Sequence, residues 1–509
     1  MEVVVIGAGV GGLTAAALLV QAGQRVTVLD AHVYPGGCAG TFYHQRYHFD
    51  AGATLAGGFA PGGPHARVAE LLGLTWPVHP VNPAWVTHLP DRAITQWADP
   101  ARWRAERQAA FPQAEAFWRQ QEHLAGLAWD IASRPFPWPP ETPRDWLTLA
   151  QALRPATLGA LPHLFQTVAG LAGAAAARDP RLKTFLDAQL LIAAQTTADD
   201  AHALYGSAAL DLPRRGVNQV RGGIGALAST LADWITAHGG QVLYRQPVTH
   251  LEIRAGRVTA AHTAKGLRVP GEAFLGNLTP WGLAEILGAS APAGLRREIA
   301  RRPATWGAFT LYLGLEAARL PAGPDHHQVV VDPARPLGEG NSVFISLSDP
   351  ADPSRAPLGQ RAATLSTHTA IAPWRTLQQH DPAGYAAREQ AYTERLLSAA
   401  ERALPGLRGA VRLSLPGTPA TFEKFTRRPL GMVGGFPQRA LFTARGPATG
   451  VPNLWLVGDS VFPGQSTAGV TLGALRVAAA VLQCLARTRH FNFPGPARRA
   501  ASSAGQTGR

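Results

Sequence analysis

The sequence is poor in cysteine, lysine and charged residues. Its 509 residues include only two cysteines, Cys38 and Cys484, which excludes a disulfide framework and a cysteine-rich metal site. Charged residues make up 16% of the chain, well below the ~25% of typical soluble domains. Hydrophobic residues make up 46%. A chain of this length and composition can bury a large core, so an intrinsically disordered protein is excluded as well.

The net positive charge comes almost entirely from arginine, because lysine is scarce. Lys and Arg number 47 against 34 Asp and Glu, a net charge of +13, yet only Lys183, Lys265 and Lys424 are lysines. The arginines are scattered, and no nucleic-acid recognition motif accompanies them. We therefore interpret the charge as a compositional bias, with a surface resting on anionic lipid as the alternative. No nucleic-acid partner is expected.

Export signals, secure membrane spans and metal motifs are also missing. A hydrophobic strand follows Met1 directly, without a basic region or a cleavage site, so no signal peptide is expected. The apolar stretch 157–177 contains Pro162, His163 and three glycines, and it predicts a buried or membrane-surface helical segment rather than a span. No HExxH, CxxC or repeated His/Asp spacing is present, and no metal is expected.

The N-terminus carries a dinucleotide-binding motif. A strand at 2–6 leads into Gly7-Ala-Gly9-Val-Gly-Gly12, followed by an Ala/Leu-rich helix over 13–21 and a strand at 25–29. Gly7 permits the tight turn, Gly9 lets the backbone approach a pyrophosphate, and Gly12 allows close helix–strand packing. The helix N-terminus offers free N–H groups to the phosphates. Asp30, which ends the second strand, is placed to accept hydrogen bonds from a ribose.

Further glycine-rich stretches indicate that the dinucleotide is FAD. The stretches 34–41, with Gly36 and Gly37, and 49–54 suit a large cofactor lying extended along the chain. Downstream, a strand starting at 454 ends in Gly458-Asp459, and a helix is predicted from 470 to about 486. A carboxylate facing ribityl hydroxyls, and a helix N-terminus at 467–469 aimed at a ring carbonyl, would suit a flavin, because the helix dipole stabilises its reduced, anionic form. A hydrolase is disfavoured because no GxSxG elbow occurs.

The middle of the chain returns to the cofactor domain and then leaves it. Residues 221–227 open a helix that runs to about 237, and strands at 241–244, 248–253, 257–262 and 266–269 form a small meander. Val248 would offer its backbone to the adenine ring. Strands of a second sheet are predicted at 305–315 and 342–347, where Trp306, Phe309 and Phe344 are candidate substrate-binding residues. The tail 491–509 is predicted to be disordered.

Tryptophan is concentrated in one region. Eight of the 13 tryptophans fall between Trp76 and Trp146. A packed core is the simplest interpretation of this cluster. Aromatic side chains that line an apolar substrate path, or a belt that meets a bilayer, are the alternatives.

Taken together, these motifs resemble the flavoprotein family of bacterial-type phytoene desaturases, carotenoid isomerases and related carotenoid oxidoreductases. The resemblance spans residues 3 to about 486. It is strongest to the carotenoid 3,4-desaturases, through the stretches 35–42 with 52–54, 61–65, 421–425 with 431–435, and 454–468. Phe462-Pro-Gly-Gln465 also looks like the isomerase branch.

The resemblance implies an α/β fold of the flavin amine oxidase type. We predict a Rossmann-type FAD-binding domain (1–75, 207–290 and 440–490) interleaved with an α+β substrate domain (76–206 and 291–439). The predicted cofactor-binding residues are Gly7, Gly9, Gly12, Asp30, Gly36, Gly37, Val248, Gly458, Asp459, Thr467, Ala468 and Gly469.

The resemblance also implies an activity. It implies non-covalent FAD, an apolar carotenoid substrate, a cytoplasmic protein resting on the inner face of the membrane, and desaturation at C3–C4 (3′,4′) of an acyclic end group that is often hydroxylated at C1. Neither a catalytic acid or base nor the electron acceptor, oxygen or a quinone, is predicted. The alternatives are a carotenoid isomerase, phytoene desaturase or ketolase, a flavin amine oxidase, and a non-enzymatic lipid escort protein.

Overall fold

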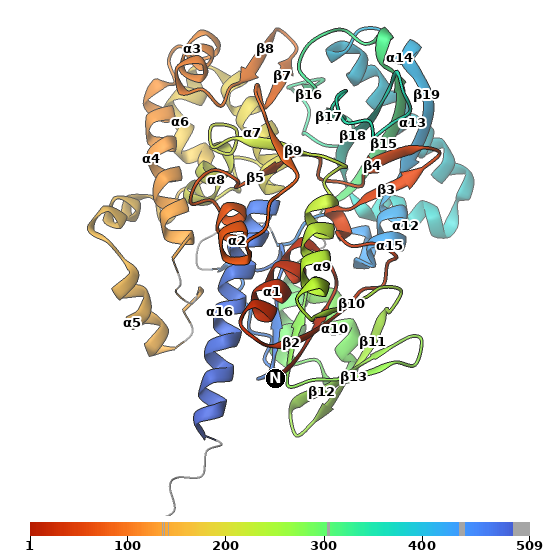
Figure 1. The fold of residues 1–509 in the computed structure, drawn as a ribbon. Coiled ribbons are helices and arrows are strands. Elements are labelled where there is room, and N and C mark those ends of the chain that lie inside the picture. Colours follow the sequence, from red (N-terminus) through yellow and green to blue (C-terminus); the bar gives the residue numbers. More distant parts are fainter. Residues whose placement is uncertain (135, 137, 141, 303–305, 437–442, 492–509) are drawn as a thin grey trace, which may run out of the picture.

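A five-stranded parallel sheet, in the order β10-β2-β1-β14-β20, lies at the centre of the computed structural model (Figure 1). The structure describes all residues except 135, 137, 141, 303–305, 437–442 and 492–509, and it leaves out the side chains of 487–491. The strands are runs of Val, Leu and Ile because both faces of the sheet are covered. Their bounds are β1 Glu2–Ile6, β2 Arg25–Leu29, β10 Gln241–Leu243, β14 Ala273–Gly276 and β20 Leu454–Leu456.

Helices cover one face of this sheet and a meander covers the other. Three strands of the predicted meander are confirmed as β11 (Val248–Arg254), β12 (Arg257–Thr263) and β13 (Arg268–Pro270). The fourth, predicted at 241–244, is β10 and pairs in parallel with β2 instead, so that part of the prediction was wrong. The sequence analysis missed β14, which pairs between β1 and β20, because its four residues end in a glycine and give a weak local signal. The helices around the sheet are α1 Val10–Gln21, α2 Pro64–Leu72, α9 Ala226–Ala237, α10 Pro280–Leu287, α11 Ala293–Arg301 and α16 Thr467–Phe491.

The helix α16 begins earlier than predicted, at Thr467, and runs to Phe491. Its stretch Thr467–Ala486 has a mean hydropathy of 1.7 and is long and apolar enough to cross a membrane, a feature that the sequence analysis did not single out. Of that stretch, 56% is buried, mainly along α1. Packing in the core of the FAD-type domain accounts for its apolar character.

A second, seven-stranded sheet has the order β19-β15-β18-β17-β16-β7-β8. Its strands are antiparallel except for β16 and β7, which are parallel. The bounds are β7 Trp85–Leu89, β8 Arg92–Gln96, β15 Gly307–Glu316, β16 His326–Val330, β17 Ser342–Leu347, β18 Gln360–Thr369 and β19 Val411–Gly417. One face packs on α12 (Ile371–His380), α13 (Pro382–Ala403) and α14 (Leu407–Ala410).

A helical layer from the first half of the chain borders this sheet (Figure 1). The segment 157–177, expected to be one helical stretch, is divided into the 3-10 helix η2 and α6. Pro162 lies in the last turn of η2, and Thr167 caps α6 by accepting the N–H of Gly170 at 3.2 Å. The helices are α3 Pro100–Ala110, α4 Glu115–Ala132, α5 Pro143–Ala152, η2 Pro155–His163, α6 Val168–Arg178, α7 Pro180–Ala194 and α8 Ala203–Leu210.

Short elements connect the two large sheets. They are the hairpin β3 (Thr41–His44) and β4 (Tyr47–Asp50), the small sheet of β5 (Ala56–Gly57), β9 (Val217–Val220) and β6 (Val78–Val81), and α15 (Pro419–Thr426). Short 3-10 turns complete the chain: η1 Gly37–Ala39, η3 Gly288–Ser290, η4 Ala317–Arg319 and η5 Pro429–Gly431. All five strands of the parallel sheet come from the segments predicted for the FAD domain, and all seven of the second sheet from the others; the exact boundaries stay a prediction.

Candidate cofactor and ligand site

The turn between β1 and α1 has glycine wherever another segment approaches closely. Gly7 has a φ of +100° and donates its N–H to the Leu29 carbonyl at 2.7 Å. A Cβ on Gly12 would lie 2.4 Å from the Gly7 oxygen, and one on Gly9 would lie 2.4 Å from Asn277 Nδ2. The positive φ of Gly7 and the contact of Gly12 with a backbone carbonyl require glycine at these two positions, whereas at Gly9 the close atom is the end of the Asn277 side chain, which can move.

Asp30, the predicted ribose contact, directly follows β2 beside this turn. Its Oδ2 accepts the Ala8 N–H and its Oδ1 accepts the His32 N–H, both at 2.6 Å. Burial raises the pKa of the Asp30 carboxyl, and the two N–H donors offset only part of that shift. The Asp30 carbonyl accepts the N–H of Gln246 at 2.7 Å, which brings the start of β11, and therefore the predicted adenine contact Val248, to the same end of the sheet.

The second glycine motif docks on the first. Gly36 has a φ of +118°, which favours glycine, and its N–H donates to the Ala8 carbonyl at 2.8 Å. Gly36 also forms an isolated bridge with Gly9, and Gly37 begins η1. The predicted cofactor stretch 34–41 therefore lies directly against the turn that is predicted to bind the phosphates.

Asp50, in the stretch 49–54, has a structural role that the sequence did not indicate. Asp50 is buried and forms a 2.9 Å ion pair with Arg355. It also accepts the Thr41 hydroxyl and the Ile224 N–H, each at 2.8 Å. These bonds tie the hairpin β3–β4 to the glycine turn 222–225, so this carboxylate anchors the site rather than facing a ligand.

Asp459 follows β20 and is paired with a cation. Arg428 Nη2 lies 2.5 Å from Asp459 Oδ2, with the two side chains 20% and 16% exposed. Arg428 Nη1 donates to the Gly434 carbonyl at 2.8 Å. A Cβ on Gly435 would lie 2.3 Å from the Asp459 carbonyl carbon, so this segment packs flat against 458–460. The Cys38 thiol lies beside Arg428, and burial raises its pKa despite that cation.

Two buried hydroxyls near the start of α16 lack protein partners. Ser460 Oγ and Thr467 Oγ1 are buried without a hydrogen-bond partner among the described residues, whereas buried hydroxyls are normally paired. Ser466 Oγ accepts the Gly469 N–H at 3.1 Å and caps the helix. Together with the glycine turns and the free N–H groups of the first helical turn, at Thr467 and Ala468, these orphan hydroxyls fit a flavin dinucleotide.

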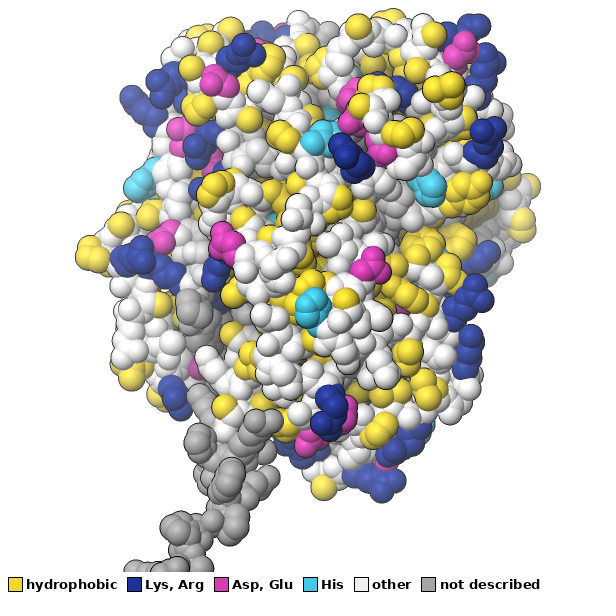
Figure 2. All heavy atoms as spheres, in the orientation of Figure 1, with side chains coloured by type: hydrophobic (Ala, Val, Ile, Leu, Met, Phe, Trp, Pro, Cys, Tyr) yellow, Lys and Arg dark blue, Asp and Glu magenta, His cyan; other side chains and the backbone are white. Residues whose placement is uncertain are grey.

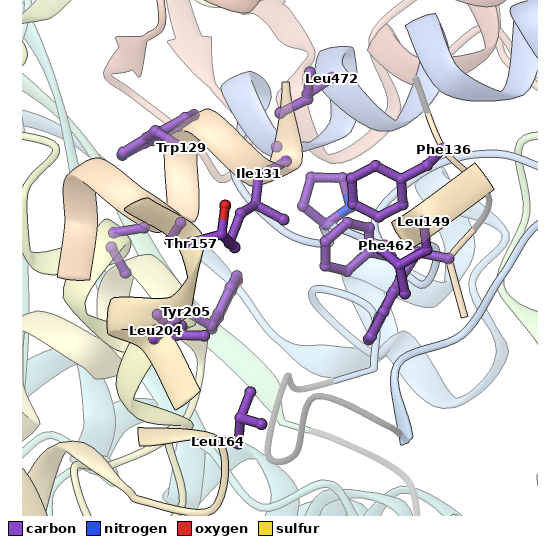
Figure 3. Close-up of a pocket in the computed structure, with 18 of the residues that line it drawn as sticks. Trp129, Ile131, Phe136, Leu149, Thr157, Leu164, Leu204, Tyr205, Phe462 and Leu472 are labelled. Carbon is purple, nitrogen blue, oxygen red and sulfur yellow. The ribbon is translucent and has the colours of Figure 1, made fainter. Parts of the chain in front are cut away.

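A cavity of about 310 Å³ adjoins the loop between β20 and α16 (Figure 3). Side chains of α4, α5, η2 and α8 form its walls, and residues 462–466 of the loop close it next to Asp459. None of the described residues that line it is Asp, Glu, His, Lys or Arg. Its largest apolar side chains are Trp129, Phe136, Trp138, Trp146, Leu149 and Phe462.

Some tryptophans of the cluster 76–146 line the cavity, and the others belong to the packed core. Trp129, Trp138 and Trp146 line the cavity, as an apolar ligand path requires. The other five pack in the interior: Trp76, Trp85, Trp103 and Trp118 are buried, and Trp97 is partly buried against the same core as Trp103.

The three residues predicted to bind substrate lie elsewhere. Phe309 has no exposed surface and stacks on Trp374 with ring centroids 5.7 Å apart, in the core between β15 and the helices α12 and α13. Phe344 packs edge-on against Trp85, and Trp306 lies near His368. None of the three lines the cavity described above. Phe309 is a core residue in this structure, and a substrate role for Trp306 and Phe344 stays a prediction.

The sequence analysis missed three residues of the site: Asn277, Arg428 and Tyr205. Asn277 lies between Gly9, Gly12 and Gly458, and an asparagine directly after a strand was its only signal. Arg428 gave no local signal beyond its position in a basic pair. Tyr205, on α8, lines the cavity beside the loop.

Comparisons with known proteins agree with this architecture. Residues 5–72 match the family model described as an NAD(P)-binding Rossmann-like domain. Among solved structures, cyclohexylamine oxidase from Brevibacterium oxydans has a TM-score of 0.61 at 14% identity, covering 96% of this chain and 99% of the oxidase. The chain therefore has a Rossmann-like dinucleotide-binding domain in a mixed α/β fold like that of the flavin amine oxidases.

Similarity also extends along almost the whole chain to carotenoid isomerases and desaturases. The chain is 27% identical to a chloroplastic prolycopene isomerase of Arabidopsis thaliana over 507 residues, covering 94% of this chain and 82% of the isomerase. It is 26% identical to a lycopene-forming phytoene desaturase of a Paracoccus species over 527 residues, covering 95% and 97%.

Proposed function

We propose that this protein is an FAD-dependent carotenoid oxidoreductase. The observation that carries the proposal is the apolar cavity that ends at loop 462–466, immediately after Gly458 and Asp459. A cavity without ionisable side chains suits a hydrocarbon substrate, and the part of its lining formed by loop 462–466 lies beside the predicted flavin site. The similarity to an isomerase and a desaturase whose names refer to carotenes supports the same substrate class.

Within this class, we propose desaturation at C3–C4 (3′,4′) of an acyclic, 1-hydroxylated end group. The reaction would remove one hydrogen as hydride and one as a proton, and FAD, when bound, would supply the acceptor for both as the reduced flavin FADH2 forms. Oxygen or a quinone then takes up the electrons. The described residues of the cavity wall include no carboxylate, histidine or lysine that could act as a base. The contribution of this chain is therefore to orient the polyene and exclude water.

A carotenoid cis–trans isomerase is the second candidate. It is favoured by the loop Phe462-Pro-Gly-Gln465, because this loop contributes to the cavity lining and its sequence resembles that of the isomerase branch. The similarity to prolycopene isomerase over 94% of this chain also favours it. An isomerase would use the same apolar cavity but would leave the composition of the substrate unchanged.

We also propose that the mouth of the cavity rests on a membrane. The residues 143–165, which include α5 and η2, form an arm beside the cavity. Six large hydrophobic side chains of this arm are between 45% and 87% exposed: Trp146, Leu147, Leu153, Leu158, Leu161 and Phe165. Figure 2 shows hydrophobic and basic side chains on the outer surface of this arm. Six exposed large apolar side chains within twenty residues are more than a scattered surface Leu or Phe would account for, and such a concentration is typical of an interaction site. Trp146, Leu153, Leu158 and Leu161 both line the cavity and reach this surface, so a lipid-dissolved substrate would enter without crossing water.

The proposal is tested by turnover in liposomes. FAD-loaded protein is incubated with 1-hydroxylated and non-hydroxylated acyclic carotenes, and product mass and absorption are followed, with FAD-free protein as the control. Loss of two hydrogens with a red shift is the expected result. Unchanged mass with a new isomer profile would establish the isomerase instead, and a gain of oxygen would indicate a ketolase. No conversion of any carotene by flavin-loaded protein would overturn the proposed function.

A further inference from the structure

Tyr205 lies at the junction between the cavity and the predicted flavin loop. It belongs to the first turn of α8, and its ring lines the cavity (Figure 3). Its hydroxyl oxygen is within hydrogen-bonding reach of the Gln465 backbone N–H, and Asp459 is close enough to act on it electrostatically. The phenol is therefore a polar group at the end of an apolar cavity that faces the flavin site.

Three other oxygen-bearing side chains line the cavity, and each makes one hydrogen bond to the backbone. The unpartnered hydroxyls of Ser460 and Thr467 do not belong to the described residues of this lining. The Thr157 hydroxyl accepts the Arg154 N–H at 3.1 Å. Gln465 Nε2 donates to the Gly435 carbonyl at 3.2 Å, and Ser466 Oγ caps α16. The Tyr205 O–H is likewise left to donate, and this phenol lies within reach of both the Gln465 N–H and the Asp459 side chain. Burial raises the pKa of this phenol, so it stays protonated at neutral pH and is a donor rather than a base.

The position of a donor in this cavity distinguishes the candidate reactions. In a 1-hydroxylated end group, a single carbon separates C1 from the C3–C4 bond, so the hydroxyl must lie next to the reacting bond and hence next to the flavin. In an isomerase or phytoene desaturase that acts near the middle of the polyene, the end group lies many carbons away. In such a reaction, the C1 position would lie too far from a donor at the flavin end of the cavity to form a hydrogen bond with it.

We propose that Tyr205 is a specificity-determining residue that donates a hydrogen bond to the C1 hydroxyl of the substrate. This inference rests on the proposed function and names the chemical feature that the site selects. The hydrogen bond holds the end group so that C3 and C4, rather than bonds further along the polyene, lie at the flavin.

The test compares Tyr205→Phe with the wild-type holoenzyme. Binding of a 1-hydroxylated acyclic carotene and of its non-hydroxylated counterpart is measured through quenching of tryptophan fluorescence, because three tryptophans line the cavity. A neutral hydrogen bond is worth about threefold to tenfold in affinity. The wild type should prefer the hydroxylated carotene by this factor, and the variant should bind both carotenes equally. Tyr385→Phe is the matched control, since its hydroxyl donates to Thr418 Oγ1 at 2.6 Å, outside the cavity, and it should keep the preference.

The outcomes separate this inference from the function on which it rests. Bound-flavin content and the visible spectrum first establish that each variant is folded. A preference that persists in Tyr205→Phe would overturn the inference, as would a preference lost instead in Trp129→Phe, whose buried indole N–H has no described partner. A wild type that converts carotenes without any preference would overturn the inference and leave the proposed function standing. A wild type that neither binds nor converts a carotene would overturn both.

Discussion

Replacing Arg428 by methionine should loosen the loop that carries Asp459. The pair is largely buried, with 20% and 16% of the side chains exposed, and joined by a 2.5 Å contact. At an effective dielectric constant of 20, and with the centres of the two delocalised charges about 4 Å apart, the attraction amounts to about 4 kcal/mol. Much of it is offset by the cost of removing both charges from water. Removing only one partner leaves an unpaired buried charge, and we expect a loss of about 3 kcal/mol in the free energy of unfolding.

A double-mutant cycle isolates this interaction. Arg428→Met and Asp459→Asn should each destabilise the flavin-free protein by about 3 kcal/mol, whereas the double variant should lose about 2 kcal/mol less than the sum, because neither residue is then left without its counter-ion. Urea-induced unfolding followed by tryptophan fluorescence measures these differences. Strict additivity of the two single substitutions would refute the reasoning.

The same variants report on the cofactor. Because the Asp459 carboxylate loses its orientation when Arg428 is removed, FAD affinity should fall about tenfold in both single variants, as measured by quenching of flavin fluorescence on titration with apoprotein. Arg107→Met is the matched control: Arg107 is 1% exposed and paired with Glu122 at 2.5 Å, in the helical layer away from the flavin motifs. It should cost similar stability and leave FAD affinity unchanged; a matching loss of affinity would mean that general destabilisation explains the result.

Three further predictions concern other parts of the molecule. Asp30→Asn should lower FAD affinity about tenfold, because a charged acceptor is lost at the ribose end, and unchanged flavin content would count against the site. Replacing both Trp146 and Phe165 by serine should reduce co-sedimentation with anionic vesicles, whereas Leu358→Ser, fully exposed elsewhere, should not; equal losses would contradict a membrane-facing arm. Burial lowers the pKa of His65 to about 3. The folded state then binds fewer protons than the unfolded state between pH ~6.5 and ~3, so stability falls as the pH decreases through this window, by up to ~1.4 kcal/mol per pH unit. His65→Phe should reduce the slope by about this amount, while His326, His327 and His368, whose pKa values burial also lowers, keep their own contributions; an unchanged slope would show that His65 does not contribute.

The dinucleotide motif could be predicted from the sequence because each of its parts has a local cause. Gly7 needs its positive φ, and Gly12 must leave room for a carbonyl that belongs to the same turn. Strand, turn, helix and acid follow one another within 30 residues, so the order of the chain is almost the order in space. The meander at 248–270 was predictable for the same reason: its strands pair with their sequence neighbours.

The cavity could not be predicted because its walls come from distant segments. Helices α4 and α8 and loop 462–466 are brought together only by tertiary packing. A pattern of apolar residues indicates a buried face without saying whether a neighbouring helix or a ligand covers it. Phe309 illustrates this ambiguity: side chains alternate between the two faces of β15, and the face that carries Phe309 is covered by Trp374 and Tyr392. The pairing of Asp459 with Arg428 is equally non-local.

At least one of the abundant arginines has a structural role that the interpretation as a compositional bias did not predict. The Arg476 guanidinium, on α16, donates to the carbonyls of Ala132 and Arg134 at 3.1 and 2.7 Å and also to the Phe136 carbonyl. It stacks on the rings of Phe136 and Phe462 as well, and both rings line the cavity. A planar group with five donors can hold several carbonyls and an aromatic face at once, whereas a lysine ammonium offers a compact charge with three donors. Arg476 thereby connects the end of α4, the cavity wall and the loop 462–466. Because the chain has few charged residues, a single guanidinium that makes several contacts replaces several separate ion pairs.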